Sequence, residues 1–194
     1  MAIGHDVVQY AVHRHLLHRP NLRLMRLLRH SVHHSTGATK GISACFMSGP
    51  DFFLEIVLPY LVPLAAIGGG GADTIFHTLV AASGAIGGLY EHSGYDFSVL
   101  LSAQRTKGEG TRSSSGSRES GRFRAVWVAI LSLLASFLAN RAHGEHHSRG
   151  NVSYSDGFGS PGLCDTLFGT RWDQVPERRR ELEHEWQAQL QHAM

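Results

Sequence analysis

The chain carries one histidine pattern, HxxHH, twice. The two copies are His30, His33 and His34, and His143, His146 and His147. Histidine makes up 14 of the 194 residues, a content from which roughly 0.07 copies of the pattern are expected by chance. On a helix the three positions fall within an arc of roughly 100°. Each box therefore presents three imidazoles on one helical face, as a metal site requires.

Three further histidines accompany the boxes: His13 and His18 before the first, and His92 between the two. Imidazole suits Zn, Cu, Fe and Ni, and nine imidazoles are too many for one tetrahedral zinc. Shared between two metals, they supply four or five nitrogens each and leave room for a small molecule, as an oxygen-activating di-iron centre needs. The predicted ligands are His13, His18, His30, His33, His34, His92, His143, His146 and His147. Because i and i+5 lie about 140° apart on an ideal helix, we expect the helix to end or unwind between His13 and His18.

Two divalent ions held only by neutral imidazoles leave about four positive charges, which carboxylates behind the rings would balance while orienting them. We expect Asp6, Glu91, Asp96 and Glu145 to do this. The isolated histidines His5, His15, His184 and His192 are interpreted as ordinary core or surface residues. His77 precedes His92 by 15 residues, about 22 Å along a helix, so it is expected at the far end of that element.

Composition excludes some other functions. The net charge of +2 does not indicate a nucleic-acid-binding surface, because such surfaces carry a large excess of basic residues on one side. The two cysteines, Cys45 and Cys164, form no CxxC pair, so neither a disulfide scaffold nor a thiolate zinc site is indicated, and a reducing compartment fits best.

Two apolar stretches, residues 52–67 and 74–90, flank a glycine-rich turn at 68–73. They predict a helical hairpin over 52–90 that crosses a membrane, with spans of about 24 and 26 Å that suit a thin endoplasmic-reticulum bilayer. A buried helix pair in a soluble protein is the alternative. Pro59 and Pro63 should kink the first helix, which a membrane helix tolerates when neighbours satisfy the freed carbonyls.

Three later segments differ in character. Residues 102–124 are rich in Ser, Gly and basic side chains, typical of a flexible insert. Residues 126–139 are apolar for 14 positions, about 21 Å, which is too short to cross. We expect this segment not to span, because crossing would strand the second HxxHH box on the opposite side. Residues 173–194 are expected to form a C-terminal helix, packed on the domain or lying on a membrane surface.

Five linked motifs resemble the fatty acid hydroxylase and sterol desaturase superfamily. Asp6 to His18 and His30 to His34 resemble its first two histidine boxes, and Glu91 to Asp96 resembles its HSGYD segment. His143 to His147 is similar to its last box, and Cys164 to Thr170 to its closing D-x-L-F-G-T motif. The resemblance covers Asp6 to Thr170. The segment from Glu91 to Asp96 is most similar to the corresponding segment of methylsterol oxidases.

The resemblance implies a mostly α-helical integral membrane protein, usually of the endoplasmic reticulum, with a histidine-rich helical metal-binding cap on the cytosolic side. It implies two irons, O2 and external electrons for hydroxylating, demethylating or desaturating a lipid. No dinucleotide-binding GxGxxG follows a strand and no haem-attachment CxxCH is present, so the electrons must come from outside the chain. The resemblance implies cytochrome b5 or an NAD(P)H-linked reductase as the donor. Sterol-type lipids are the first expectation; fatty acids and sphingolipids stay open.

The chain also departs from the family pattern. Relatives generally carry another hairpin before the first box, so the chain looks truncated or minimal. Some have a histidine where this chain has Gly88, and the 51-residue connection from His92 to His143 is long. One alternative is therefore a catalytically inactive relative that binds metal or lipid as a membrane interaction protein. A soluble histidine-rich zinc binder is another, although the apolar spans count against it.

Overall fold

The computed structural model describes residues 1–19, 22–70, 73–101, 118–155 and 157–176. Regular structure in these residues is entirely helical, so the expected mostly α-helical class is confirmed. Most of the expected insert and most of the expected C-terminal helix lie outside the described residues. Helix α8 (Arg118–Phe137) begins within the range 102–124 that was expected to be an insert.

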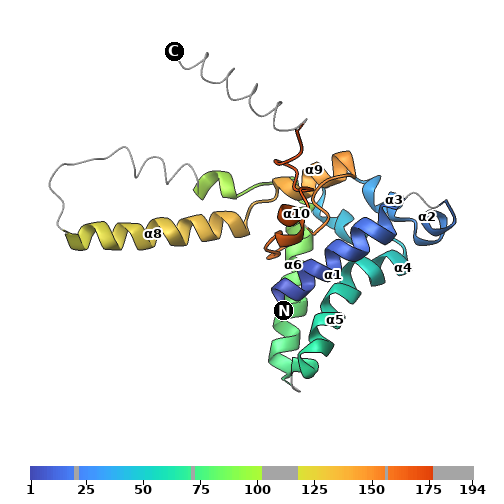
Figure 1. The fold of residues 1–194 in the computed structure, drawn as a ribbon, viewed down its shortest axis with the longest axis horizontal. Coiled ribbons are helices and arrows are strands. Elements are labelled where there is room, and N and C mark those ends of the chain that lie inside the picture. The colour runs from blue at the N-terminus through green and yellow to red at the C-terminus, as the bar shows by residue number, and fades with distance from the viewer. Residues whose placement is uncertain (20–21, 71–72, 102–117, 156, 177–194) are drawn as a thin grey trace, which may run out of the picture.

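The predicted hairpin is formed by two antiparallel helical arms. The first arm runs without interruption through α4 (Gly49–Phe52), the π-helix η3 (Phe53–Val57) and α5 (Leu58–Ala66). The short η4 turn (Gly68–Gly70), with glycines at positive φ, reverses the chain into α6 (Thr74–Glu91). Near this turn the Tyr60 hydroxyl lies 2.8 Å from His77 Nδ1, which ties the arms together. Figure 1 shows the turn at the bottom of the molecule, remote from α3 (His30–His34) and α9 (Arg141–Arg149).

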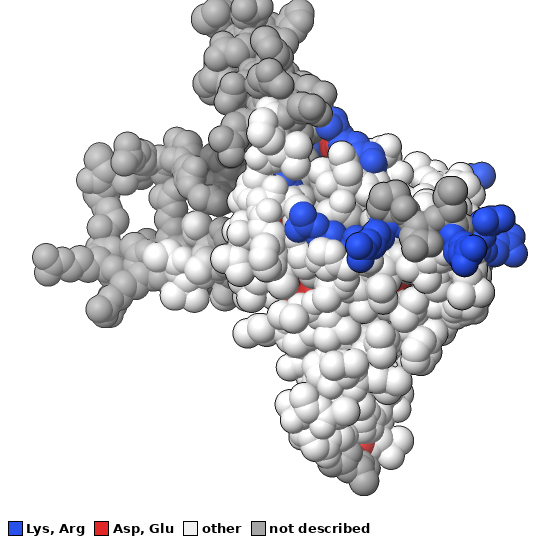
Figure 2. Space-filling view, turned by 45° about the vertical axis from the view of Figure 1, so that its right-hand side comes forward, with Lys and Arg blue, Asp and Glu red and all other residues white. Residues whose placement is uncertain are grey.

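Much of the hairpin surface is apolar and exposed. Ile75, Leu79 and Ile86 on α6 are each more than 60% exposed. In Figure 2 the basic side chains of the visible face lie in the upper part of the molecule, above the largely uncharged hairpin. An apolar surface of this extent is expected where lipid replaces water.

Two helical stretches of the described residues are long and apolar enough to cross a membrane: Gly49–Ala66 and Ala125–Arg149. The first coincides with the first hairpin arm. The α6 helix is not among them, since glycines and polar residues such as His77 dilute its apolar character. The protein thus has two candidate membrane helices and a histidine-rich helical region.

The second candidate stretch is divided in two. Helix α8 (Arg118–Phe137) ends before Asn140, and α9 (Arg141–Arg149) begins after it. The Asn140 side-chain amide donates to the carbonyls of Tyr90 and Tyr95 at 3.2 and 3.0 Å, which fixes the junction against the end of α6. In Figure 1, α8 extends sideways, across the direction of the hairpin.

The remaining short helices form a cap at the open end of the hairpin. They are α1 (Ala2–Val12), the π-helix η1 (His13–Leu17), α2 (Leu22–Leu28), α3 (His30–His34), η2 (Gly41–Cys45), α9 and α10 (Leu163–Leu167). Helix α1 packs against α5, where Gly4 permits close approach: a Cβ there would lie 2.6 Å from Pro63 Cβ. A small apolar cluster of Val12, Leu17 and Leu28 supports the cap from below.

Candidate metal centre

The interior of the cap is built around histidines rather than apolar side chains. His13 follows α1, His18 follows η1, and His92 directly follows α6. The two HxxHH boxes occupy α3 and α9, where their rings face inward. Seven of the nine predicted ligands are buried, and His18 and His34 are half-buried.

A π turn brings His13 and His18 together. Their i, i+5 spacing would separate them on an α-helix, but here the backbone N–H of His18 donates to the His13 carbonyl at 2.9 Å, the pattern of a π-helix. The ring centroids are consequently 4.9 Å apart. The helix thus neither ends nor frays at His13; it widens by one residue.

The nine rings form two adjoining groups. In the first, the nitrogens of five histidines lie within 4.8 Å of one another; they are His13, His18, His30, His34 and His146. The second contains His33, His92 and His147 by the same measure. His143 joins this second group, because its Nε2 lies 3.0 Å from His92 Nε2. The groups touch where His34 and His147 stack with centroids 4.6 Å apart.

Several rings share one orientation, with Nδ1 held from outside and Nε2 directed inward. His13 Nδ1 donates to the Tyr154 carbonyl at 2.9 Å, and His146 Nδ1 donates to the Val152 carbonyl at 2.6 Å. A proton fixed on Nδ1 leaves the Nε2 lone pair bare, which is the tautomer that binds a metal.

The tautomer of His92 follows from a chain of two hydrogen bonds. The Ser43 hydroxyl donates its single hydrogen to the Lys40 carbonyl at 2.7 Å. In its 3.3 Å contact with His92 Nδ1, the hydroxyl oxygen must therefore accept a hydrogen bond from the ring N–H. His92 Nε2 is left bare, facing His143.

Burial keeps most of these rings neutral. Burial and the neighbouring imidazoles lower the pKa of His18 to about 3 and the pKa values of His34 and His92 to about 4. His30 differs. Burial alone would lower its pKa, but hydrogen bonds and charge from Asp51 and Glu55 raise it to about 9.

The donor set fits a pair of transition-metal ions. Among the described residues, the buried nitrogens His33 Nδ1, His146 Nε2 and both ring nitrogens of His147 have no hydrogen-bond partner. Leaving such groups unpaired in a protein interior is costly. Metal coordination would satisfy them, and a cluster of imidazoles without thiolates suits iron, zinc or copper.

The carboxylates that face the rings are Asp51 and Glu55, neither of which was predicted from sequence. Asp51 is fully buried and lies 2.9 Å from His30 Nδ1. Glu55 is 6% exposed and lies 3.4 Å from His30 Nδ1 and 3.8 Å from His33 Nε2. One signal could have identified them: they are the two charges in the otherwise apolar first arm, spaced i, i+4 at its start.

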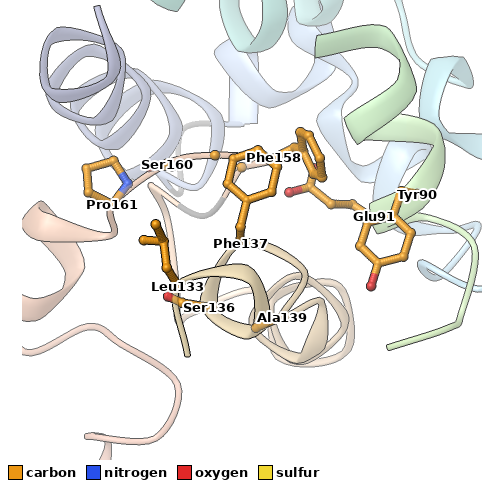
Figure 3. A pocket seen from close by; sticks show the side chains of 11 residues that line it. Tyr90, Glu91, Leu133, Ser136, Phe137, Ala139, Phe158, Ser160 and Pro161 are labelled. Carbon is orange, nitrogen blue, oxygen red and sulfur yellow. The ribbon is translucent and has the colours of Figure 1, made fainter. Parts of the chain in front are cut away.

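The four carboxylates that were predicted from sequence to support the rings lie in other surroundings. Asp6 accepts from the backbone N–H groups of Leu163 and Cys164, both at 2.9 Å, and so fixes the start of α10. Asp96 accepts from Ser98, Glu145 pairs with Arg141 and Arg149, and Glu91 lines a cavity beside α8 (Figure 3). The contacts described for Asp6, Asp96 and Glu145 are thus with groups other than the clustered rings.

The other described histidines lie apart from the two groups. His15 is exposed on η1, and His77 contacts Tyr60 near the hairpin turn. His5 is half-buried in α1. His184 and His192 lie outside the described residues.

The sequence model of the fatty acid hydroxylase family matches residues 1–114, more than half of the chain and all the predicted ligands up to His92. No curated protein and no solved structure shows significant similarity to the chain. The three ligands beyond the match, in α9, complete both histidine groups. The chain therefore belongs to the fatty acid hydroxylase family.

Proposed function

We propose that this protein is an O2-dependent di-iron oxidase of a sterol or fatty-acyl lipid, embedded in the endoplasmic-reticulum membrane. The observation that carries the proposal is the division of nine histidines into two touching groups, in which backbone carbonyls hold the Nδ1 protons of His13 and His146 and leave their Nε2 atoms bare. A single zinc would need four ligands at most. Two groups of five and four suit two ions side by side.

The iron pair would be held by His13, His18, His30, His34 and His146 in one group, and by His33, His92, His143 and His147 in the other. When bound, iron supplies the activation of O2 and the oxidation of an unreactive C–H bond. Electrons come from outside the chain, from cytochrome b5 or an NAD(P)H-linked reductase.

The chain's own residues prepare and protect this centre. The Tyr154 and Val152 carbonyls hold the rings of His13 and His146 in the binding tautomer. Asp51 and Glu55 add negative charge beside His30, which offsets the charge of the ions. Burial of the rings excludes water, which would otherwise compete for the metal and quench reactive species.

The charge distribution supports a cytosolic cap. The segment preceding the hairpin contains the basic residues Arg14, Arg19, Arg23, Arg26, Arg29 and Lys40, whereas residues 67–73 at the hairpin turn contain none. Basic residues near membrane helices remain on the cytosolic side. With both arms spanning, the turn faces the lumen and all nine histidines face the cytosol.

In this arrangement α8 does not cross the bilayer. Its direction across the hairpin (Figure 1) is that of a helix lying along the membrane surface. A crossing would carry α9 to the other side and separate His143 from His92, whose Nε2 atoms are 3.0 Å apart.

The direct test is oxidation of a lipid panel by the detergent-purified, iron-loaded chain with an NADH-driven cytochrome b5 system. Sterols, ceramides and fatty acyl lipids are supplied with isotopically labelled O2, and products are identified by mass spectrometry. The proposal predicts a hydroxylated, demethylated or desaturated lipid that forms only with O2, iron and reductant. Bound metal or lipid without any turnover would instead identify an inactive, binding relative.

A further inference from the structure

We propose that Tyr10 and Tyr154 form an electron path between the group of five histidines and the surface of the cap. Through this path the chain reduces the O2-derived oxidant of the proposed reaction when no lipid is present to consume it. The inference rests on the proposed function, because it concerns an oxidant that the same centre would form.

The inner end of the path is Tyr154, which lies beside the group of five histidines. Its ring centroid is 5.5 Å from that of His18, 5.9 Å from that of His146 and 6.1 Å from that of His13. The Tyr154 side chain is buried, and its backbone carbonyl accepts from His13 Nδ1 at 2.9 Å. A phenol ring therefore packs directly against three of the predicted ligands.

Tyr10 continues the row of rings toward the surface. Its ring centroid lies 6.0 Å from that of Tyr154, with the rings perpendicular, and 5.1 Å from that of Phe168, with the rings nearly parallel. Both distances are typical of directly packed aromatic rings, roughly 4.5–7 Å. Tyr10 is 4% exposed and Phe168 is 58% exposed. The row thus runs from the histidines to a ring that solvent reaches.

The Tyr10 hydroxyl also has a proton acceptor, which a phenol needs when it gives up an electron. Thr170 Oγ1 lies 2.6 Å from Asp165 Oδ1 and 3.3 Å from the Tyr10 hydroxyl. Because the single hydroxyl hydrogen of Thr170 is donated to the carboxylate, the Tyr10 hydroxyl donates to Thr170. The Arg14 guanidinium donates to the Tyr10 oxygen, so this oxygen remains hydrogen-bonded after its own proton has left.

The closing D-x-L-F-G-T motif, which contains none of the predicted metal ligands, holds this path together. Asp165 accepts from the Thr170 hydroxyl and also from the backbone N–H of Tyr154, the latter at 2.9 Å. Phe168 of the same motif packs on Tyr10. The motif therefore positions both tyrosines and the proton acceptor together.

One electron and one proton move in the proposed step. The oxidant takes one electron from Tyr10 through the Tyr154 ring, while the Tyr10 O–H bond breaks and its proton passes to Thr170 Oγ1. The Thr170 hydroxyl proton passes at the same time to Asp165. The external electron donor then gives one electron to the Tyr10 radical, and the protons return along the same hydrogen bonds. Because a phenol yields an electron only to a strong oxidant, the path does not serve the reduction that precedes O2 binding.

The test withdraws an electron from the surface end of the path and needs no oxidase activity. The full chain is studied in detergent with redox-inert zinc in place of iron. A ruthenium photo-oxidant is attached to a Leu167→Cys variant in a Cys45→Ser background, since Leu167 is 79% exposed and adjoins Phe168. Tyr154 is replaced by 3-aminotyrosine, which is oxidised more easily than tyrosine and so traps the charge that reaches this position. The radical formed after a light flash is measured by electron paramagnetic resonance.

We expect an aminotyrosyl radical in the labelled chain and its loss when Tyr10→Phe is added, because phenylalanine keeps the ring but has no O–H to oxidise. Tyr95→Phe is the matched control; its ring stacks on Phe97, and the radical yield should not change. Thr170→Val should slow radical formation. Thr170→Ser should restore the rate, because a serine hydroxyl again accepts the Tyr10 proton.

An equal radical yield in the Tyr10→Phe chain would overturn the inference. The absence of a radical at position 154 once the photo-oxidant has been reduced would do the same. Circular dichroism verifies that each variant keeps its helices. None of these results depends on iron or turnover, so the electron path can fail while the oxidase proposal stands, and the reverse.

Discussion

His30 Nδ1 lies 2.9 Å from the carboxylate of Asp51, and this contact joins the first hairpin arm to the centre of the histidine cluster. On its other side, His30 Nε2 lies 3.0–3.2 Å from the Nε2 atoms of His13, His18 and His34. One ring is therefore held from outside by a buried charge and surrounded inside by three potential ligands. Asp51 itself is positioned by its backbone N–H, which donates to Ser48 Oγ at the start of α4.

Replacing Asp51 by Asn should weaken metal binding. The amide keeps the shape of the side chain but loses the charge that holds the Nδ1 proton and offsets the bound ions. We expect a loss of about tenfold to hundredfold in metal affinity, measured by competition with a chelator. Asp173→Asn, which alters an ion pair with Arg171, is the control. Equal affinity of the Asp51 variant and the wild type would contradict the role given to Asp51.

Metal binding at pH 7 should release about one proton per chain. Asp51 and Glu55 raise the pKa of His30 to about 9, so this ring carries a proton in the metal-free protein that the ion must displace. The lowered pKa values of His18, His34 and His92 leave those rings neutral already. The number of protons released on metal binding should decline toward zero as the pH rises above 9.

The measurement is calorimetric titration of the metal-free protein in buffers of different ionisation enthalpy. The Asp51→Asn variant should release less than the wild type at pH 7, because the pKa of His30 falls when the carboxylate is lost. Release of many protons, or proton release that increases with rising pH, would show that the histidine rings do not have the protonation states described.

The histidine sites could be anticipated from sequence because helical spacing alone fixes which residues share a face. The HxxHH pattern predicts that three histidine rings share one helical face. The two boxes lie on α3 and α9, and in each helix the histidine rings face the interior of the cap. The π turn at His13–Leu17 could not be anticipated, since a one-residue widening is selected by tertiary packing. The spacing of His13 and His18 indicates only that the two rings require a departure from the α-helix.

His18→Ala should remove one metal ion from the chain, because His18 belongs to the group of five and has no role in the other group. His15→Ala is its matched control: it lies on the same π turn but is exposed. Metal content after purification compares the two. Equal losses in both variants would mean that the π turn, rather than the ring at position 18, governs metal retention.

Membrane sidedness can be measured with the natural Cys45, which is exposed on the cap. In sealed microsomes an impermeant maleimide should label Cys45 without detergent. It should also label a Ser148→Cys variant made in a Cys45→Ser background, since α8 is predicted not to cross. A cysteine replacing Ile67, beside the hairpin turn, should react only after permeabilisation. Protection of position 148 in intact vesicles would instead place α8 across the bilayer.

The carboxylates that contact the histidine rings could not be predicted from the residues next to each box. Asp6, Glu91, Asp96 and Glu145 were predicted because they lie near boxes along the chain, yet the contacts described for Asp6, Asp96 and Glu145 are with other groups and Glu91 lines a cavity beside α8. Asp51 and Glu55 are 17 or more residues beyond the first box. They reach the rings where the first hairpin arm contacts His30 of α3. Their i, i+4 spacing in an apolar arm marks them as unusual, but it does not indicate which histidines they contact.

Iron content of the intact chain tests the central claim most directly. The protein is expressed with added iron, purified in detergent without chelators, and analysed for all transition metals by plasma mass spectrometry against quantified protein. Two adjoining histidine groups predict about two irons per chain, falling to about one in His18→Ala. A single zinc per chain, or no bound metal in a folded wild-type protein, would contradict the di-iron centre.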